Sequence, residues 1–162
     1  MAKSSSNRIL VTPSSYAKAH YLYVQEVGSL KSLEPHISSR KNLNSYLFFV
    51  VVNGHGTLTY QNETISLSAG DCVWIDCHLP YAHESSEFDP WSLTWVHFDG
   101  NDAAHFYQSY MEQGLPYHFH PGNILPFVET INTLYESCRS QDFLSELKNN
   151  RSLTDLITMI YE

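Results

Sequence analysis

The stretch Ser45-Tyr46-Leu47-Phe48-Phe49-Val50-Val51-Val52, followed by Asn53-Gly54, decides the fold class. Aromatic and β-branched residues favour strands, and this run is too short for a typical helix. Its apolar side chains continue without alternation, so we expect a strand that is buried on both faces. The Asn-Gly pair is a strong turn signal and should end the strand.

Shorter strand-like segments lie on both sides of this stretch. Gly28, Gln61-Asn62-Glu63, Ala69-Gly70-Asp71 and Asp99-Gly100 separate them. Short strands with turns every eight to twelve residues are typical of an antiparallel sandwich or barrel. We therefore predict a mainly β fold, a jelly roll or barrel, from about residue 9 to residue 100. The predicted strands span residues 21–27, 45–52, 56–60, 64–67, 72–75 and 91–98.

After Gly100 the apolar residues recur at helical spacing, which predicts a helical segment over residues 101–162. Asn101 is a candidate cap for its first helix, and Ser152 with Asp155 resembles a capping pair for the last. That last helix reaches Glu162 without a glycine or proline stop, so we expect more chain to follow. Residues 1–100 and 101–162 are expected to form one structural unit.

The middle helix carries an apolar stripe that permits two interpretations. The stripe either forms a dimer seam or packs on the barrel. It comprises Phe127, Ile131, Leu134 and Cys138.

The distribution of charge excludes one class of function. The net charge is -8, and residues 46–136 carry eleven Asp and Glu but no Lys or Arg. A nucleic-acid face needs clustered cations to displace counterions from phosphates. The middle of this chain is therefore not built to hold DNA on its own surface.

Other bulk features favour a cytoplasmic domain without a membrane partner. The longest apolar run, residues 47–52, is far shorter than a membrane-spanning helix, and residues 1–8 lack the apolar region of a secretory signal. Cys72, Cys77 and Cys138 form no CxxC pair, so reduced thiols in or near the core are expected.

An ordered set of landmarks runs from Arg40 to Gly100. They are Tyr46 opening the apolar strand, Asn53-Gly54-His55-Gly56, Leu67-Ser68-Ala69-Gly70-Asp71, Pro80-Tyr81-Ala82-His83, and Trp91 to Phe98 followed by Asp99-Gly100. In this order, with helices behind them, they resemble the sugar-sensing domains of AraC-type transcription regulators. The resemblance implies a cupin barrel that binds an effector and a helical pair for homodimerisation. Because the sequence has no Gly-x-Ser-x-Gly elbow and no convergent set of metal ligands on the barrel strands, we expect no cofactor and no catalysis. DNA contact would come only through a C-terminal helix-turn-helix domain, which has no counterpart here.

The resemblance also implies where an effector would bind. It places Arg40 where an arginine reaches into the barrel, and a guanidinium offers a fixed fork of donors for hydroxyls or a carboxylate. Trp95 matches a position where an indole stacks on a sugar ring. Trp91, Leu93 and His97 share its face of the strand. The alternative for Arg40 is an ordinary exposed arginine, and the alternative for Trp91 and Trp95 is that they are core residues without a ligand contact. Arabinose-sensing members have a histidine at Leu93, so arabinose itself is not implied.

Further candidates lie in loops and in the first strand. His83 and Tyr81 belong to the segment that closes the barrel mouth in the resembling family. Glu26 is polar within an apolar strand, and the corresponding family strand supplies a ligand contact. Thr12 and Pro13 resemble part of the arm that folds over the effector. Together these residues predict a site for a small polar effector, with carbohydrate as the favoured class.

Two rival functions remain at this point. A metal-dependent cupin enzyme would need a His-x-His pair on an early strand, where only His55 stands in a glycine turn. His118-x-His120 has the local spacing but lies between predicted helices, so we expect a surface pair. The second rival is a stand-alone carbohydrate-binding module.

Overall fold

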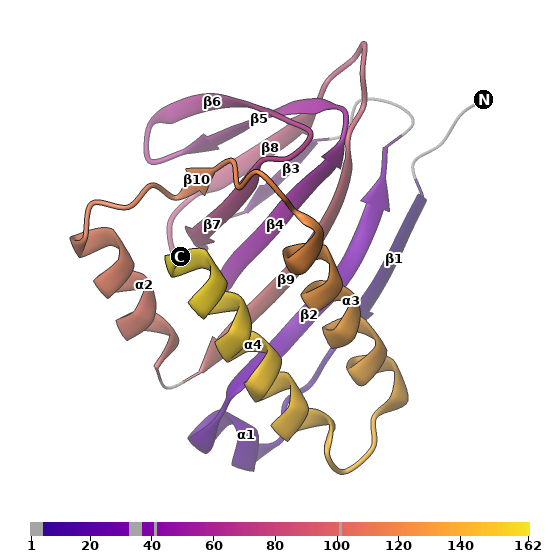
Figure 1. Ribbon diagram of the computed structural model, residues 1–162, viewed down its shortest axis with the longest axis vertical. Coiled ribbons are helices and arrows are strands. Elements are labelled where there is room, and N and C mark those ends of the chain that lie inside the picture. The colour runs from indigo at the N-terminus through magenta and orange to yellow at the C-terminus, as the bar shows by residue number, and fades with distance from the viewer. Residues whose placement is uncertain (1–4, 33–36, 41, 101) are drawn as a thin grey trace.

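The structure, a computed structural model, describes residues 5–32, 37–40, 42–100 and 102–162. In the described residues two antiparallel sheets face each other, and helices cover the outer face of the larger one (Figure 1). The larger sheet has the order β1-β2-β9-β4-β7-β10, with the strands Ser5–Leu10, Leu22–Lys31, Ser92–Gly100, Tyr46–Asn53, Cys72–Asp76 and His118–Phe119. The smaller sheet has the order β3-β8-β5-β6, with the strands Ile37–Arg40, Tyr81–Ser85, His55–Tyr60 and Glu63–Ser68. The helices are α1 (Ser15–His20), α2 (Ala103–Glu112), α3 (Leu125–Ser140) and α4 (Ser145–Tyr161).

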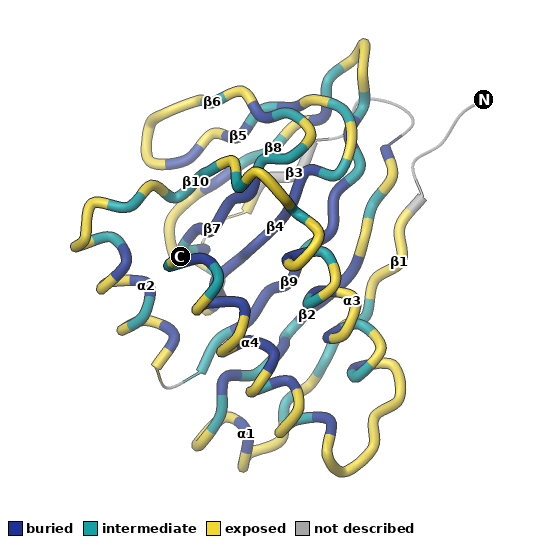
Figure 2. The backbone as a smooth tube through the Cα atoms, in the orientation of Figure 1, coloured by how far each residue is buried: buried dark blue, intermediate teal, exposed yellow. Residues whose placement is uncertain are grey.

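Strand β4 is buried on both faces, as its unbroken apolar run predicted. Leu47, Phe49 and Val51 point between the two sheets. Tyr46, Phe48 and Val50 point the other way, into the core beneath the helices. The chain therefore has two apolar cores that share one sheet, and the tube coloured by burial shows the buried strands running between them (Figure 2). The sheet-rich fold predicted for residues 9–100 is confirmed.

The hairpin between β5 and β6 has the tip that the sequence indicated. Gln61 and Asn62 both adopt positive φ, at 52° and 63°, and join strands that pair from Tyr60–Glu63 outward. Two left-handed residues match the right-handed twist of the flanking strands.

Three elements depart from the sequence prediction. Strand β2 does not end at Gly28 but continues to Lys31, because β9 pairs with it throughout. Strand β1 has no counterpart among the predicted strands, and it pairs with β2 from Ser5–Lys31 to Leu10–Glu26. Strand β10, in the loop between helices, pairs with β7.

The helix boundaries also differ from the expected caps. Asn101 lies outside the described residues, and the N-cap residue of α2 is Asp102. The Ser152–Asp155 cap is wrong, because α4 begins seven residues earlier, at Ser145. There Asp142 accepts hydrogen bonds from the Leu144 amide and the Ser145 hydroxyl. Ser152 lies within the helix on its buried face, in line with Ser145 and Asn149.

Helix α3 buries its apolar stripe inside the chain. Its four stripe residues are 0–6% exposed and pack in the core beneath the helices, where α3 contacts β2, β9 and α4. The residues are Phe127, Ile131, Leu134 and Cys138. Of the two interpretations of the stripe, packing on the barrel is the one seen here. In this structure these side chains offer no surface to a second subunit.

The short helix α1 ties the N-terminal strand to α4. Ser14 caps α1 by accepting a hydrogen bond from the Ala17 amide at 3.1 Å. The Ser14 hydroxyl and amide both donate to the Glu146 carboxylate, at 2.6 and 2.9 Å. The segment that follows β1 is therefore hydrogen-bonded to the first turn of α4.

Replacing Ser14 with alanine should lower the free energy of unfolding by about 1 kcal/mol, since it removes an N-cap and one bond to Glu146. Urea denaturation of both proteins measures this difference. Ser140→Ala is the matched control, because Ser140 is exposed and bonds only to Ser137 of its own helix. Equal urea midpoints for the two variants would show that the hydrogen bonds of Ser14 do not contribute to the free energy of unfolding.

Candidate functional site

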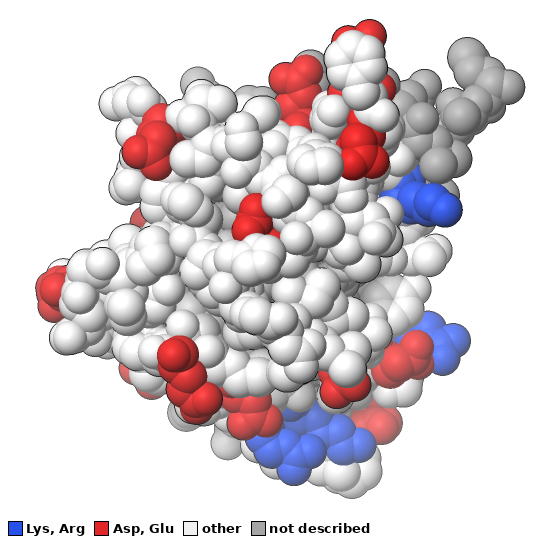
Figure 3. All heavy atoms as spheres, turned by 45° about the horizontal axis from the view of Figure 1, so that its top comes forward, with Lys and Arg blue, Asp and Glu red and all other residues white. Residues whose placement is uncertain are grey.

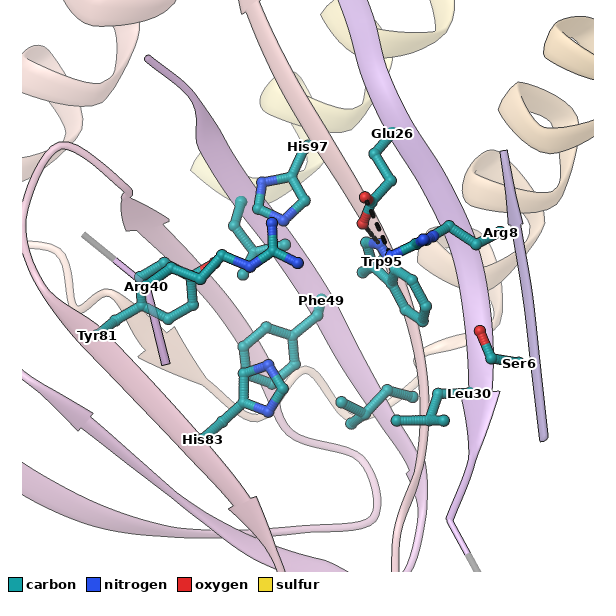
Figure 4. A pocket seen from close by; sticks show the side chains of 12 residues that line it. Ser6, Arg8, Glu26, Leu30, Arg40, Phe49, Tyr81, His83, Trp95 and His97 are labelled. Atoms are coloured by element: carbon teal, nitrogen blue, oxygen red, sulfur yellow. Dashed lines mark hydrogen bonds and ion pairs between the residues drawn. The ribbon is translucent and has the colours of Figure 1, made fainter. Parts of the chain in front are cut away.

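A cavity of about 190 Å³ lies between the two sheets, bounded by β1, β2, β4 and β9 on one side and by β3 and β8 on the other (Figure 4). Its lining combines two arginines, one carboxylate and two histidines with aromatic and leucine side chains. The lining residues are Ser6, Arg8, Glu26, Leu30, Arg40, Leu47, Phe49, Tyr81, His83, Leu93, Trp95 and His97. Enclosed concave sites with a few convergent polar groups are the usual places for small ligands.

An irregularity in β2 directs Glu26 toward this cavity. The register between β2 and β9 shifts between Val24 and Glu26, which leaves Gln25 as an extra residue. Val24 and Val27 both face the core beneath the helices. In a regular strand residues 24 and 26 would share a face, but here the bulge turns Glu26 to the cavity side.

Glu26 is 8% exposed and has two partners. Its Oε2 accepts a hydrogen bond from Trp95 Nε1 at 2.7 Å. Its Oε1 lies 3.9 Å from the guanidinium of Arg8 on β1. Trp95 stands opposite Gly28 in the register, and a Cβ at Gly28 would lie 3.1 Å from the indole and 2.3 Å from the Asn7 carbonyl oxygen. The missing side chain of Gly28 thus lets β1 and the indole approach β2 closely.

Arg40 ends β3 directly opposite Tyr81 of β8. The arginine is exposed as a residue, yet its guanidinium extends into the cavity beside His97 (Figure 4). It forms none of the ion pairs found among the described residues.

His97 and Tyr81 are the neutral polar groups nearest to Arg40. Burial, with the charge of Arg40 as a smaller cause, lowers the pKa of His97 to about 4. Its Nδ1 lies 3.0 Å from the Ser45 hydroxyl. Burial also raises the pKa of Tyr81 well above its usual value, and the tyrosine shares a hydrogen bond with the Cys77 thiol. At neutral pH both groups are uncharged donors or acceptors.

His83 lies at the centre of an aromatic cluster beneath the polar groups. Its ring centroid is 5.8 Å from Phe49, 5.7 Å from Trp91 and 6.3 Å from Tyr81, with which it is stacked. These contacts fix the imidazole on the floor of the cavity.

The structure brings six of the predicted effector contacts together. They are Arg40, Trp95, His83, Tyr81, Glu26 and His97. Three others lie elsewhere. Trp91 is fully buried below the cavity, with its ring over Gly56, and Thr12 and Pro13 line a separate hollow beside Tyr46 and His78.

The sequence prediction missed six lining residues. Ser6 and Arg8 come from β1, whose polar first residues and exposed Leu10 do not follow the usual alternation of a strand, so no clear signal in the sequence marks it. Leu30 follows Gly28, where the strand was expected to end. The other three, Leu47, Phe49 and Leu93, are strand residues whose inward direction was predictable but whose place beside the cavity was not.

The histidine pair in the loop between α2 and α3 makes no metal cluster. In the part of the chain that the structure describes, no three His, Cys, Asp or Glu side chains gather as a metal site. His120 Nδ1 instead lies 2.9 Å from an Asp71 oxygen, joining that loop to the turn before β7. In the same described ranges no helix is both long and apolar enough to cross a membrane.

Two curated relatives are regulators of bacterial operons. The chain is 30% identical over 57 residues to the lactose operon transcription activator of Staphylococcus xylosus, covering 35% of this chain and 20% of the relative. It is 22% identical over 87 residues to the MmsAB operon regulatory protein of Pseudomonas aeruginosa, covering 51% and 28%. The chain thus matches less than a third of either relative's length.

Solved structures agree on the fold. The AraC-like transcriptional activator CuxR superposes with a TM-score of 0.54 at 8% identity, covering 96% of this chain and 60% of that one. Cupin barrels are also among the matches, including the cupin domain of an XRE-family regulator from Enterobacter cloacae, with a TM-score of 0.48, 14% identity, and 62% and 100% coverage. The likeness to the AraC-like activator agrees with the predicted β fold followed by helices.

The family model of the AraC-like ligand-binding domain matches residues 25–111. This range is more than half of the chain and runs from within β2 through β9, strands that carry most of the cavity wall. The chain therefore belongs to the AraC-like ligand-binding domain family.

Proposed function

We propose that this chain is the sensor domain of a transcription regulator and that it binds a small polar effector, a carbohydrate, in the cavity between its two sheets. The observation that carries the proposal is the convergence of Arg40, Glu26, Trp95 and His97 on one partly enclosed cavity. Aromatic faces suit the C–H side of a sugar ring, and the polar groups suit its hydroxyls.

The distribution of charge supports a sensor that does not itself hold DNA. On the face shown in Figure 3, Lys and Arg occur only toward the margins, whereas Asp and Glu are scattered across it. DNA would be contacted by an attached helix-turn-helix domain, in a cytoplasmic homodimer. Since the α3 stripe is buried within the chain, a dimer would use other side chains.

The segment from β1 to α1 links the cavity to the helices, because it contacts both. Ser6 and Arg8 of β1 line the cavity, and Ser14 at the end of the same segment holds Glu146 of α4. An effector that contacts Arg8 would favour the docked arrangement of this segment, and it would bias the regulator only by its difference in affinity for the two states.

A thermal-shift screen of the chain against monosaccharides and sugar acids tests the proposal. A ligand at 100 times its dissociation constant stabilises the fold by about 2.7 kcal/mol, which is about 5–10 °C for a chain of this size. Trp95→Ala should abolish the shift, whereas Phe143→Ala, at a side chain 93% exposed and outside the cavity, should leave it unchanged. A shift that persists in Trp95→Ala would place the ligand outside this cavity, and a panel without any shift would contradict the carbohydrate assignment.

A further inference from the structure

The polar end of the cavity carries a net positive charge. Arg8 and Arg40 contribute two cations, and Glu26 is the single acidic residue in the lining, so the sum is +1. The chain as a whole has the opposite sign, with a net charge of -8. Two of the nine Lys and Arg residues of the chain thus meet at one small cavity.

The one carboxylate in the lining is already engaged. Glu26 accepts the Trp95 Nε1–H at 2.7 Å and lies 3.9 Å from Arg8. Arg40 takes part in none of the ion pairs formed by the described residues. Its neighbours Tyr81 and His97 stay neutral at pH 7 and therefore cannot balance its charge. A guanidinium aimed into a partly enclosed space has its five donors available to an anion.

The part of the cavity away from Arg40 and His97 is more apolar. Leu30 lies there beside Ser6, Phe49 lies beside His83 (Figure 4), and Leu47 and Leu93 complete the apolar lining. A ligand with hydroxyl groups on every edge would leave some of them against leucine, where an unpaired polar group is costly. A body with one charged end and one less polar face fits this division better.

We propose that the effector carries a carboxylate that pairs with the guanidinium of Arg40, while its remaining body lies against Trp95, Phe49 and the leucines. The inference rests on the proposed effector site; a sugar acid would keep the carbohydrate assignment, whereas a short hydroxy acid would replace it. The carboxylate can belong to a sugar acid or to a short hydroxy acid, because both present the same group on a small polar body. A cavity of about 150 Å³ holds benzene, so 190 Å³ suits a ligand of monosaccharide size or smaller.

Calorimetric titration with matched pairs of ligands tests this assignment. Each pair differs only in a carboxylate against a hydroxymethyl group: glucuronate and glucose, galacturonate and galactose, 3-hydroxybutyrate and 1,3-butanediol. We expect at least one acid to bind about tenfold or more tightly than its neutral partner, as charge-assisted bonds to arginine require. The arm in which this occurs identifies the source of the carboxylate.

Arg40→Gln should remove the preference, so that the acid then binds about as weakly as its neutral partner. Arg139→Gln is the matched control, because it removes the same charge at an exposed position on α3 that pairs with Glu136 outside the cavity. The control should keep the preference. Arg40 is itself exposed, and equal melting temperatures without ligand would confirm that both variants fold.

The outcomes separate this inference from the proposed function. If neutral sugars bind as tightly as their acids, the proposal of a carboxylate on the effector is wrong, whereas the proposed carbohydrate sensor still stands. An acid preference that survives Arg40→Gln would remove Arg40 from the site. Binding by neither acids nor neutral sugars would overturn both proposals.

Discussion

Replacing Trp74 with alanine should lower the free energy of unfolding by about 3–5 kcal/mol. Trp74 is fully buried on β7 and contacts two tyrosines of α2, with ring centroids 4.9 Å from Tyr107 and 5.1 Å from Tyr110. The substitution leaves a large cavity at the junction of sheet and helix, which the packed surroundings can fill only in part. Urea denaturation followed by circular dichroism measures the loss.

Phe143→Ala is the control for this experiment. It removes another large aromatic side chain, but one that is 93% exposed, so its effect should stay within about 0.5 kcal/mol. A loss below about 1 kcal/mol in Trp74→Ala would contradict the packing of α2 against β7.

His97 should make the fold sensitive to mild acid. Its pKa falls from 6.5, the value expected in the unfolded chain, to about 4 in the fold, chiefly through burial. Between these two values the unfolded chain binds the proton and the folded chain does not. The free energy of unfolding should therefore fall as the pH decreases from about 6.5 to about 4, by roughly 3 kcal/mol in total.

Comparison with His97→Gln isolates this contribution from that of the carboxylates. Glutamine retains a polar group beside the Ser45 hydroxyl but does not titrate. Urea midpoints measured from pH 7.5 to pH 4 should fall more steeply for the original chain than for the variant. Parallel curves would show that His97 is protonated in the folded state or is not buried as described.

The direction of many side chains could be predicted from the sequence, because strands alternate with a period of two. Trp95 and His97 were expected on one face, and both line the cavity. Arg8 could not be assigned in this way, since its place depends on the pairing of β1 with β2, a contact between distant segments. Nor does the composition of residues 24–26 mark which residue forms a bulge.

The apolar stripe of α3 shows that the sequence could predict a buried helix face but not what packs against it. A helix packed on a sheet and a helix packed on a second subunit need the same spacing of apolar residues. Only the position of β2, β9 and α4 around Phe127 and Leu134 decides between them here. The start of α4 was misplaced for a related reason, because Ser152 has a capping residue type but lies on a buried helical face.

The bulge at Gln25 means that the number of residues in β2, and not only their identity, determines which of its side chains line the cavity. One extra residue switches the following side chains between the cavity side and the helix side of the strand, without changing any of those side chains. In a regular strand Gln25 would face the cavity and Glu26 the helices, which would leave the Trp95 indole without its acceptor. Deletion of Gln25 itself would restore regular alternation and keep Glu26 on the cavity side, whereas an insertion or deletion on only one side of the bulge would change which side chains of β2 line the cavity.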